Sequence, residues 1–191
     1  VGSAVKGASM AVGYQNGIID IGTTMTDSCV KLANIPAKCS YRRLGSLNDI
    51  EALALSSNYY QFIIALGIMG QKYTYNMSVE ATTQHFDIYR ETFAEFGLGT
   101  TTGIDLLNES TGLKGTTIAP DLLMNFAIGK YDLYTPTQLL QYINTNASNG
   151  TRLKLNLMYQ IQDQDKVIIE RKVEALNEVN LEEKYLQRNQ E

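Results

Sequence analysis

The chain has 191 residues, of which 44% are apolar, and this is enough to bury one hydrophobic core. Its 16 Lys and Arg residues against 20 Asp and Glu residues give a net charge of -4, and no strongly basic block occurs, so nucleic acid is not an expected partner. No apolar run reaches the roughly 18 residues that a bilayer-spanning helix needs. We therefore expect one soluble domain.

The first residues carry no initiator Met and no basic, apolar leader. Such leaders direct a protein to the secretory route and are removed from the mature chain. We expect the chain to be a piece of a longer protein, with any signal or membrane anchor upstream of it.

Residues 3–17 show small and apolar side chains at helical spacing, among them Val5, Ala8 and Val12, and Gly17 can end the helix. This places Ser3 in the first turn. Residues 18–41 carry β-branched residues, Thr-rich stretches and a proline, which predicts short strands and a loop excursion.

Two helices are predicted next, separated by the polar triplet Ser56-Ser57-Asn58. The first covers residues 46–55, with Ser46 as its N-cap. Its inward stripe is expected to be Ile50, Leu53 and Ala54. The second covers residues 59–69 and is apolar nearly all round, as a helix inside a core would be.

The following segments again show helical spacing. Residues 83–96 predict an amphipathic helix whose aromatic side chains face the core. A long ordered loop follows over residues 97–115, then a short helix over residues 120–128. A further helix begins at Thr135-Pro136 and ends at Asn149-Gly150. Its inward side chains are expected to be Leu139, Leu140 and Ile143.

The period changes at residues 152–174, where apolar and polar residues alternate around Asp163-Gln164-Asp165, the pattern of a β-hairpin. Residues 181–191 form a charged tail that is expected to be helical. The sum is an α+β fold dominated by helices.

Cys29 and Cys39 have neither the spacing of a redox pair nor that of zinc ligands. They are two free thiols, or one local disulfide if the protein is extracellular. His85 is the only histidine, and without a Gly-x-Ser-x-Gly elbow it is expected to be a solvated residue at a helix start.

Ser3 and Lys6 form a candidate nucleophile motif, because a spacing of three puts the amine and the hydroxyl on the same helix face. A serine is a weak nucleophile until a neighbour takes its proton, and a lysine can do so only when burial or nearby positive charge leaves it neutral. The motif is common by chance, and Ser28 with Lys31 repeats it.

The pattern Ser-x-Asn also occurs twice, at Ser46-Leu47-Asn48 and at Ser56-Ser57-Asn58. Ser46 precedes a helix and is most simply its cap. Ser56 and Asn58 lie between two apolar helices, where each polar group buried without a partner would cost roughly 1–3 kcal/mol. A functional pocket therefore explains Ser56 and Asn58 better than packing does.

These segments together resemble a known family. Residues 1–9 and 13–17 resemble the nucleophile helix of class B penicillin-binding proteins, in which Pro-Gly-Ser-x-x-Lys is usual and Val1 takes the place of the proline. Residues 45–58 look like the second motif of that family with its approach helix. The resemblance continues through residues 96–112, 134–139 and 149–150, and it is greatest to the 2B-like branch of Gram-positive bacteria.

The resemblance implies part of a serine β-lactamase/transpeptidase-like fold, with an all-α lobe and a few strands. It makes Ser3 the acyl-enzyme nucleophile, Lys6 its general base, Ser56 a proton relay and Asn58 an amide that holds the substrate peptide. The implied reaction is acyl transfer from a peptidoglycan stem peptide ending in D-Ala-D-Ala to an amine. β-Lactam antibiotics mimic the donor, and neither metal nor organic cofactor is needed.

The resemblance also implies cell-wall synthesis proteins as partners and a full-length protein on the extracellular face of the bacterial membrane. One departure concerns the third family motif, Lys-Ser/Thr-Gly, which is missing here, since Lys114-Gly115-Thr116 has the wrong order. We expect that motif beyond Glu191, so the chain is predicted to be a transpeptidase-domain fragment cut at both ends. Part of the central sheet would be missing, and activity would be low, because one oxyanion donor alone is worth about 10²–10³ in rate.

Two other functions stay open at this point. One is a β-lactam sensor or β-lactamase of the same superfamily, which uses the same serine and lysine but differs in the fate of the acyl-enzyme. The other is a non-catalytic cell-wall scaffold whose motif residues only cap helices. Labelling with penicillin would separate these functions.

Overall fold

The computed structural model describes residues 2–191, so Val1, which takes the place of the family's proline, lies outside the described residues. Seven α-helices dominate this part of the chain. A 3-10 turn, η1 (Gly2–Val5), runs into the first helix. The helices are α1 (Lys6–Gln15), α2 (Asp49–Ala54), α3 (Asn58–Ile68), α4 (Thr83–Glu95), α5 (Pro120–Ala127), α6 (Pro136–Ala147) and α7 (Glu183–Arg188). The predicted helix-dominated α+β class is confirmed.

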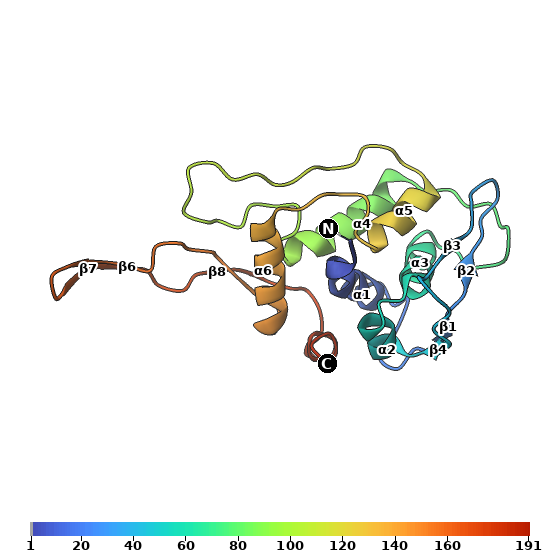
Figure 1. The fold of residues 1–191 in the computed structure, drawn as a ribbon, viewed down its shortest axis with the longest axis horizontal. Coiled ribbons are helices and arrows are strands. Elements are labelled where there is room, and N and C mark those ends of the chain that lie inside the picture. Colours follow the sequence, from blue (N-terminus) through green and yellow to red (C-terminus); the bar gives the residue numbers. More distant parts are fainter. Residues whose placement is uncertain (1) are drawn as a thin grey trace.

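The strands form four separate antiparallel pairs. β1 (Met25–Thr26) pairs with β4 (Ser46–Leu47), and β2 (Cys29–Val30) pairs with β3 (Lys38–Cys39). β5 (Thr151–Leu153) pairs with β8 (Ala175–Glu178), and β6 (Gln160–Asp163) pairs with β7 (Lys166–Glu170). The last pair is the predicted hairpin, and it projects away from the helices (Figure 1).

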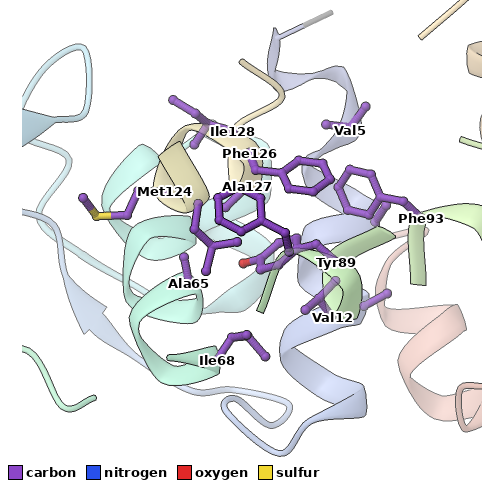
Figure 2. Packing of buried hydrophobic residues seen from close by; sticks show 14 of the residues in the cluster. Val5, Val12, Ala65, Ile68, Tyr89, Phe93, Met124, Phe126, Ala127 and Ile128 are labelled. Carbon is purple, nitrogen blue, oxygen red and sulfur yellow. The ribbon is translucent and has the colours of Figure 1, made fainter. Parts of the chain in front are cut away.

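Helix α1 lies at the centre of the helical part, and every residue from Lys6 to Tyr14 is buried. Helices α3, α4 and α5 surround it, and aromatic rings fill the space between them (Figure 2). Phe93 and Phe126 meet edge to face with ring centroids 5.3 Å apart, a favoured geometry for aromatic pairs. The aromatic face predicted for α4 is confirmed, since all its members are at most 1% exposed: Phe86, Tyr89, Phe93 and Phe96.

The prediction that Ser46 caps a helix is wrong. Ser46 lies in β4, opposite Thr26 of β1, and the N-cap of α2 is Asn48, which forms a capping box with Glu51. Strand pairing therefore delays the helix start. This shifts the buried face to Asp49 and Ala52, whereas Ile50 and Leu53 are half-buried and Ala54 is exposed.

The inward face predicted for α6 is also wrong for two of its residues, because Leu140 is 60% exposed and Ile143 is 57% exposed. The buried side chains include Gln138 and Gln141. The Gln141 side-chain amide donates to the carbonyls of Thr102 and Leu153, at 2.9 and 2.7 Å. Backbone carbonyls of the loop over residues 97–115 need such donors, which explains why α6 turns a polar face inward.

Cys29 and Cys39 are joined by a disulfide, which decides between the two states left open by the sequence. His85 lies in the first turn of α4, half-buried, and its Nδ1 accepts a hydrogen bond from the backbone N–H of Thr82. Within residues 2–191, no cluster of His, Cys, Asp or Glu has the make-up of a metal site. No helix in the same range combines the length and apolarity needed to cross a bilayer.

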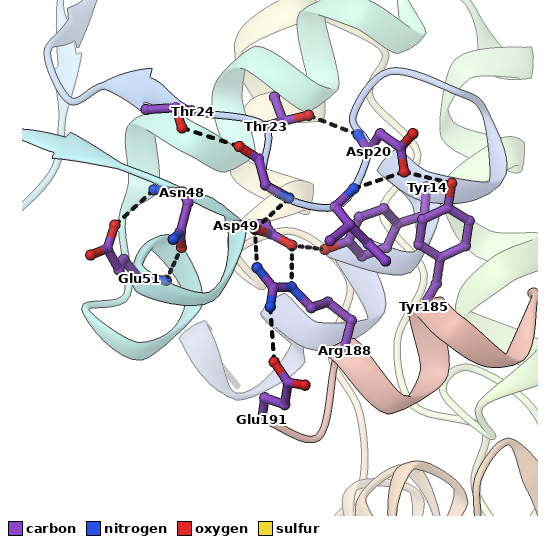
Figure 3. Close-up of polar contacts among 12 residues, drawn as sticks. Tyr14, Asp20, Thr23, Thr24, Asn48, Asp49, Glu51, Tyr185, Arg188 and Glu191 are labelled. Atoms are coloured by element: carbon purple, nitrogen blue, oxygen red, sulfur yellow. Dashed lines mark hydrogen bonds and ion pairs between the residues drawn. The ribbon is translucent and has the colours of Figure 1, made fainter.

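The charged tail is docked on the domain through the buried carboxylate of Asp49 (Figure 3). Arg188 of α7 donates to both oxygens of Asp49, from Nε at 2.8 Å and from Nη2 at 2.9 Å. The Tyr14 hydroxyl donates to Asp49 at 2.8 Å, and the Tyr185 ring stacks on Tyr14 with centroids 4.6 Å apart. Burial opposes the charge of Asp49, but hydrogen bonds led by that of Arg188 outweigh it and hold the pKa of Asp49 below its usual value.

Substitution Asp49→Ala should lower the free energy of unfolding by about 3 kcal/mol, because it leaves a buried hydroxyl and a guanidinium without their acceptor. Substitution Glu191→Gln, which alters the exposed second partner of Arg188, is the matched control and should change it by at most about 0.5 kcal/mol. Urea denaturation of this chain measures both. Equal losses in the two variants would contradict the docking role of Asp49.

Candidate active site

Ser3 and Lys6 are held at the start of the central helix. Ser3 lies in the 3-10 turn η1 and Lys6 begins α1. In a 3-10 turn, side chains three positions apart eclipse one another, so the hydroxyl and the amine start from the same side. The turn is anchored because the Gly2 N–H donates to the Gly129 carbonyl at 2.9 Å. Gly129 has a φ of +73°, and a Cβ there would overlap the Gly2 carbonyl oxygen, so this close approach requires glycine.

The Lys6 ammonium is buried and fully hydrogen-bonded. The residue is 1% exposed. Its Nζ donates to the Ser56 carbonyl at 2.7 Å, to the Ser56 Oγ at 3.0 Å and to the Asn58 Oδ1 at 2.8 Å. An ammonium has three N–H donors, and these three acceptors use them all. Three of the four predicted site residues are therefore joined directly, although about 50 positions separate Lys6 from the other two.

The surroundings of Lys6 favour its neutral form. Burial, and secondarily the positive charge of Lys130, lower the pKa of Lys6 from 10.5 to about 8, while the negative charge of Asp27 opposes the shift. At pH 7 about a tenth of such an amine is neutral, compared with far less than a hundredth of an ordinary lysine. Lys6 therefore has the properties that a general base requires.

Ser56 lies at a strained backbone position in the turn between α2 and α3. Its φ is +53°. Its N–H donates to the Leu53 carbonyl at 3.0 Å, and the Ser57 N–H donates to the Ala52 carbonyl at 2.8 Å. These two bonds close a helix C-terminus of the Schellman type, in which glycine usually takes the left-handed position. A serine there costs stability, and such strain is typical of functional sites.

Asn58 opens α3, and its amide is held from both sides. The oxygen accepts from Lys6, and Nδ2 donates to the Cys39 carbonyl at 3.2 Å. Ser57, the N-cap of α3, accepts from the Tyr60 N–H and is 1% exposed. Ser56 and Asn58 are only half-buried, so the fully buried member of the predicted triplet is Ser57.

Ser3 is the fourth predicted site residue. It is exposed and lies in η1, the 3-10 turn that leads into α1. Within residues 2–191, no hydrogen bond joins its hydroxyl to Lys6. The geometry thus places Ser3 one turn before Lys6. Its role as nucleophile stays a prediction.

The duplicate motifs are separated by the tertiary structure. Ser28 and Lys31 flank strand β2 on its two sides, and positions three apart along extended chain face opposite ways. The Lys31 amine donates to backbone carbonyls, among them that of Leu32 at 3.1 Å. In the other Ser-x-Asn match, Ser46-Leu47-Asn48, the asparagine caps α2. Among these matches in residues 2–191, hydrogen bonds join only Lys6 of the Ser-x-x-Lys motif to Ser56 and Asn58 of the Ser-x-Asn motif.

Three residues near this site were missed by the sequence analysis: Asp27, Ser40 and Lys130. Asp27 is a buried acid that touches both Ser40 and Ser57. Lys130 follows the glycine that anchors the first turn. No spacing rule links these residues to Ser3 or Asn58, since they come from separate segments. The only signal in the sequence was an isolated acid in a region of expected short strands, and it is a weak one.

Comparison with known proteins adds to this geometry. Residues 1–191 match the family model "Penicillin binding protein transpeptidase domain" over their whole length. The chain belongs to the class B penicillin-binding proteins. It is similar to penicillin-binding protein 2A of Bacillus subtilis, with 37% identity over 98% of this chain and 27% of the relative. It is also similar to penicillin-binding protein 2B of Streptococcus pneumoniae, with 41% identity over 80% of this chain and 23% of the relative.

A solved structure of penicillin-binding protein 2B from S. pneumoniae strain 5204 superposes on this chain with a TM-score of 0.92 and 36% identity. The match covers 97% of this chain and 33% of that one. The chain thus spans about a quarter of the length of the curated relatives and a third of the solved one. The resemblance to class B penicillin-binding proteins and to their transpeptidase fold is confirmed.

The strain at Ser56 can be measured by comparing two variants that both lack the hydroxyl. Ser56→Gly should be about 1 kcal/mol more stable than Ser56→Ala, because only alanine keeps a Cβ in the left-handed conformation. Thermal or urea unfolding of this chain measures the difference. The same pair of substitutions at Ser148, whose φ is negative, is the control and should favour alanine instead. If alanine were also the more stable residue at position 56, the backbone there would not be strained.

Proposed function

We propose that this chain carries the nucleophile, base and relay of a serine D,D-transpeptidase that cross-links peptidoglycan. The observation that carries the proposal is the buried Lys6 amine, which lies one turn after Ser3 and bonds to Ser56 and Asn58. The pKa of about 8 suits this amine to proton transfer, and strongly shifted pKa values of this kind are typical of functional sites.

In the proposed reaction, neutral Lys6 takes the Ser3 hydroxyl proton while Ser3 Oγ attacks the carbonyl of the D-Ala-D-Ala peptide bond. The C–N bond then breaks, and the proton passes through the Ser56 hydroxyl, 3.0 Å from Lys6 Nζ, to the departing D-Ala amine. The acyl group remains on Ser3 until an acceptor amine attacks the ester. The Asn58 amide holds the peptide of the donor. A β-lactam enters the same first step, because its strained amide takes the place of the D-Ala-D-Ala bond.

The proposed reaction also needs the oxyanion donor of the Lys-Ser/Thr-Gly motif, which a longer protein would supply. Residues 1–191 contain no Lys-Ser/Thr-Gly tripeptide, so we propose that the chain is part of one transpeptidase domain and turns over little substrate by itself. The Cys29–Cys39 disulfide supports a location on the extracellular face of the membrane, because disulfides persist in oxidising compartments. Peptidoglycan stem peptides, β-lactams and other cell-wall synthesis proteins are the proposed partners.

Labelling by fluorescent penicillin tests the nucleophile. A longer protein that contains this chain and a Lys-Ser/Thr-Gly segment should form a stable adduct, and Ser3→Ala should abolish it. Ser28→Ala, which removes the serine of the duplicate motif, is the matched control and should leave labelling unchanged. Rapid loss of the adduct would favour a β-lactamase over a transpeptidase, and a folded protein that forms no adduct would contradict both enzymes.

The base can be tested through pH. Because neutral Lys6 is the reactive form, the rate of penicillin acylation should rise with pH and level off above about 8, the pKa of that amine. Lys6→Arg should lower the rate by about 10²-fold or more at every pH, since a guanidinium does not lose its proton. Lys72→Arg, at an exposed lysine, is the control and should leave the rate unchanged at every pH. A rate that is independent of pH between 6 and 9 would exclude Lys6 as the base.

A further inference from the structure

A disulfide-closed segment packs against the active-site turn. We call residues 27–40 the flap. Its strands β2 and β3 pair so that Cys29 lies opposite Cys39, and the disulfide joins these two residues. Asp27 lies two positions before the first cysteine, and Ser40 directly follows the second. The disulfide therefore holds together the two ends of the flap, and both ends contact the start of α3.

Asp27 organises the hydroxyls at this point. It is 8% exposed, and its Oδ2 accepts hydrogen bonds from Ser40 Oγ at 2.6 Å and from Ser57 Oγ at 2.7 Å. Each serine donates its single hydroxyl proton to the carboxylate. Both serine oxygens are thereby left to act as acceptors toward other groups.

These two oxygens cap the first turn of α3. Ser40 Oγ accepts from the backbone N–H groups of Asn58 and Tyr59, at 3.0 and 3.2 Å. Ser57 Oγ accepts from the Tyr60 N–H at 3.1 Å. A helix leaves its first four N–H groups without an intrahelical partner. The two serines satisfy three of them here, and Ser40 of the flap accounts for two of these three. The Asp27 charge also favours this positive end of the helix.

The flap also sets the direction of the Asn58 side chain. Asn58 Nδ2 donates to the Cys39 carbonyl, which leaves Oδ1 pointing at Lys6 Nζ. With the amide turned over, its N–H donors would face the three N–H donors of the Lys6 ammonium, and both groups would lose a partner. A helix cap needs no contact of this kind, so the Cys39 contact points to a role in orienting Asn58.

We propose that Asp27 and Ser40, tied together by the Cys29–Cys39 disulfide, are positioning residues that hold Asn58 with its amide oxygen toward Lys6. The proposal rests on the function proposed above for Lys6 and Asn58. Asp27 and Ser40 touch neither Ser3 nor the reacting bond in this arrangement, and they act through the first turn of α3. Asp27 in addition contributes a negative charge near the Lys6 amine.

The experiment follows penicillin acylation against pH in a longer protein that contains this chain and a Lys-Ser/Thr-Gly segment. Ser40→Ala should lower the plateau rate about tenfold without moving the midpoint of the pH profile, and Ser40→Thr, which keeps the hydroxyl, should restore most of it. Ser148→Ala is the matched serine control, because among residues 2–191 the Ser148 hydroxyl makes only a long contact of 3.5 Å to Asn144. Replacing both cysteines with serine should lower the plateau as Ser40→Ala does.

The charge of Asp27 gives a readout that a purely structural role would not move. Asp27→Asn should lower the plateau and shift the midpoint to lower pH, because it removes the charge that raises the pKa of Lys6. Lys130→Gln should shift the midpoint to higher pH, because it removes a charge that lowers the same pKa. Lys130 is exposed and has no ion-pair partner within residues 2–191, so it serves as the opposite-sign comparison.

The possible failures are distinguishable. The proposed function is contradicted if the unaltered protein forms no penicillin adduct, or if the Ser3→Ala variant still forms one. If the unaltered protein reacts normally and the Asp27 and Ser40 variants match it in plateau and midpoint, the positioning role alone is overturned. A plateau that falls only in proportion to the folded fraction, measured by circular dichroism on the same samples, overturns it too.

Discussion

The arrangement depends on burying an amine that water would otherwise solvate. Lys6 is almost entirely removed from solvent in the centre of the helical part. An ammonium can be buried only if acceptors replace its hydration. Ser56 in the turn between α2 and α3 supplies two of them, and Asn58 at the start of α3 supplies the third, all within 3.0 Å. The same burial weakens its hold on the proton. The hydrogen bonds of the Lys6 amine therefore hold it in place, while its removal from water lowers its pKa toward that of a base.

Several costly features serve this one group. Ser56 takes a backbone conformation that suits glycine, and Gly129 allows a backbone approach that no other residue permits. The Asp27 carboxylate is buried under the start of α3. None of these features is needed for a bundle of helices to fold. Together they bring the first turn of α1 against the α2–α3 turn and hold the amide of Asn58 toward the amine.

The outer elements stabilise the domain by long-range polar contacts. Helix α7 is short, yet it is fixed by the Arg188–Asp49 pair and by stacking on Tyr14 (Figure 3). Helix α6 is oriented by Gln141, which donates to the Thr102 carbonyl of a distant loop and accepts from Arg152. As a result Leu140 and Ile143 face outward, against the preference of their side chains. Satisfying buried backbone groups outweighed the burial of two aliphatic residues.

Local pattern determined much of this protein from sequence alone. Helical spacing located the helices, the aromatic face of α4 and the shared turn of Ser3 and Lys6, because a 3.6-residue period is a short-range property. Alternation located the β6–β7 hairpin for the same reason. Tertiary contacts decided the rest. They bring Lys6 to Ser56 and Asn58 rather than to the duplicate motifs, and they join Cys29 to Cys39. Pairing of β4 moves the helix cap from Ser46 to Asn48, and folding brings Asp27 and Ser40 to the start of α3. Each of these joins segments whose separation along the chain carries no periodic signal, so only the folded arrangement of the segments brings them together.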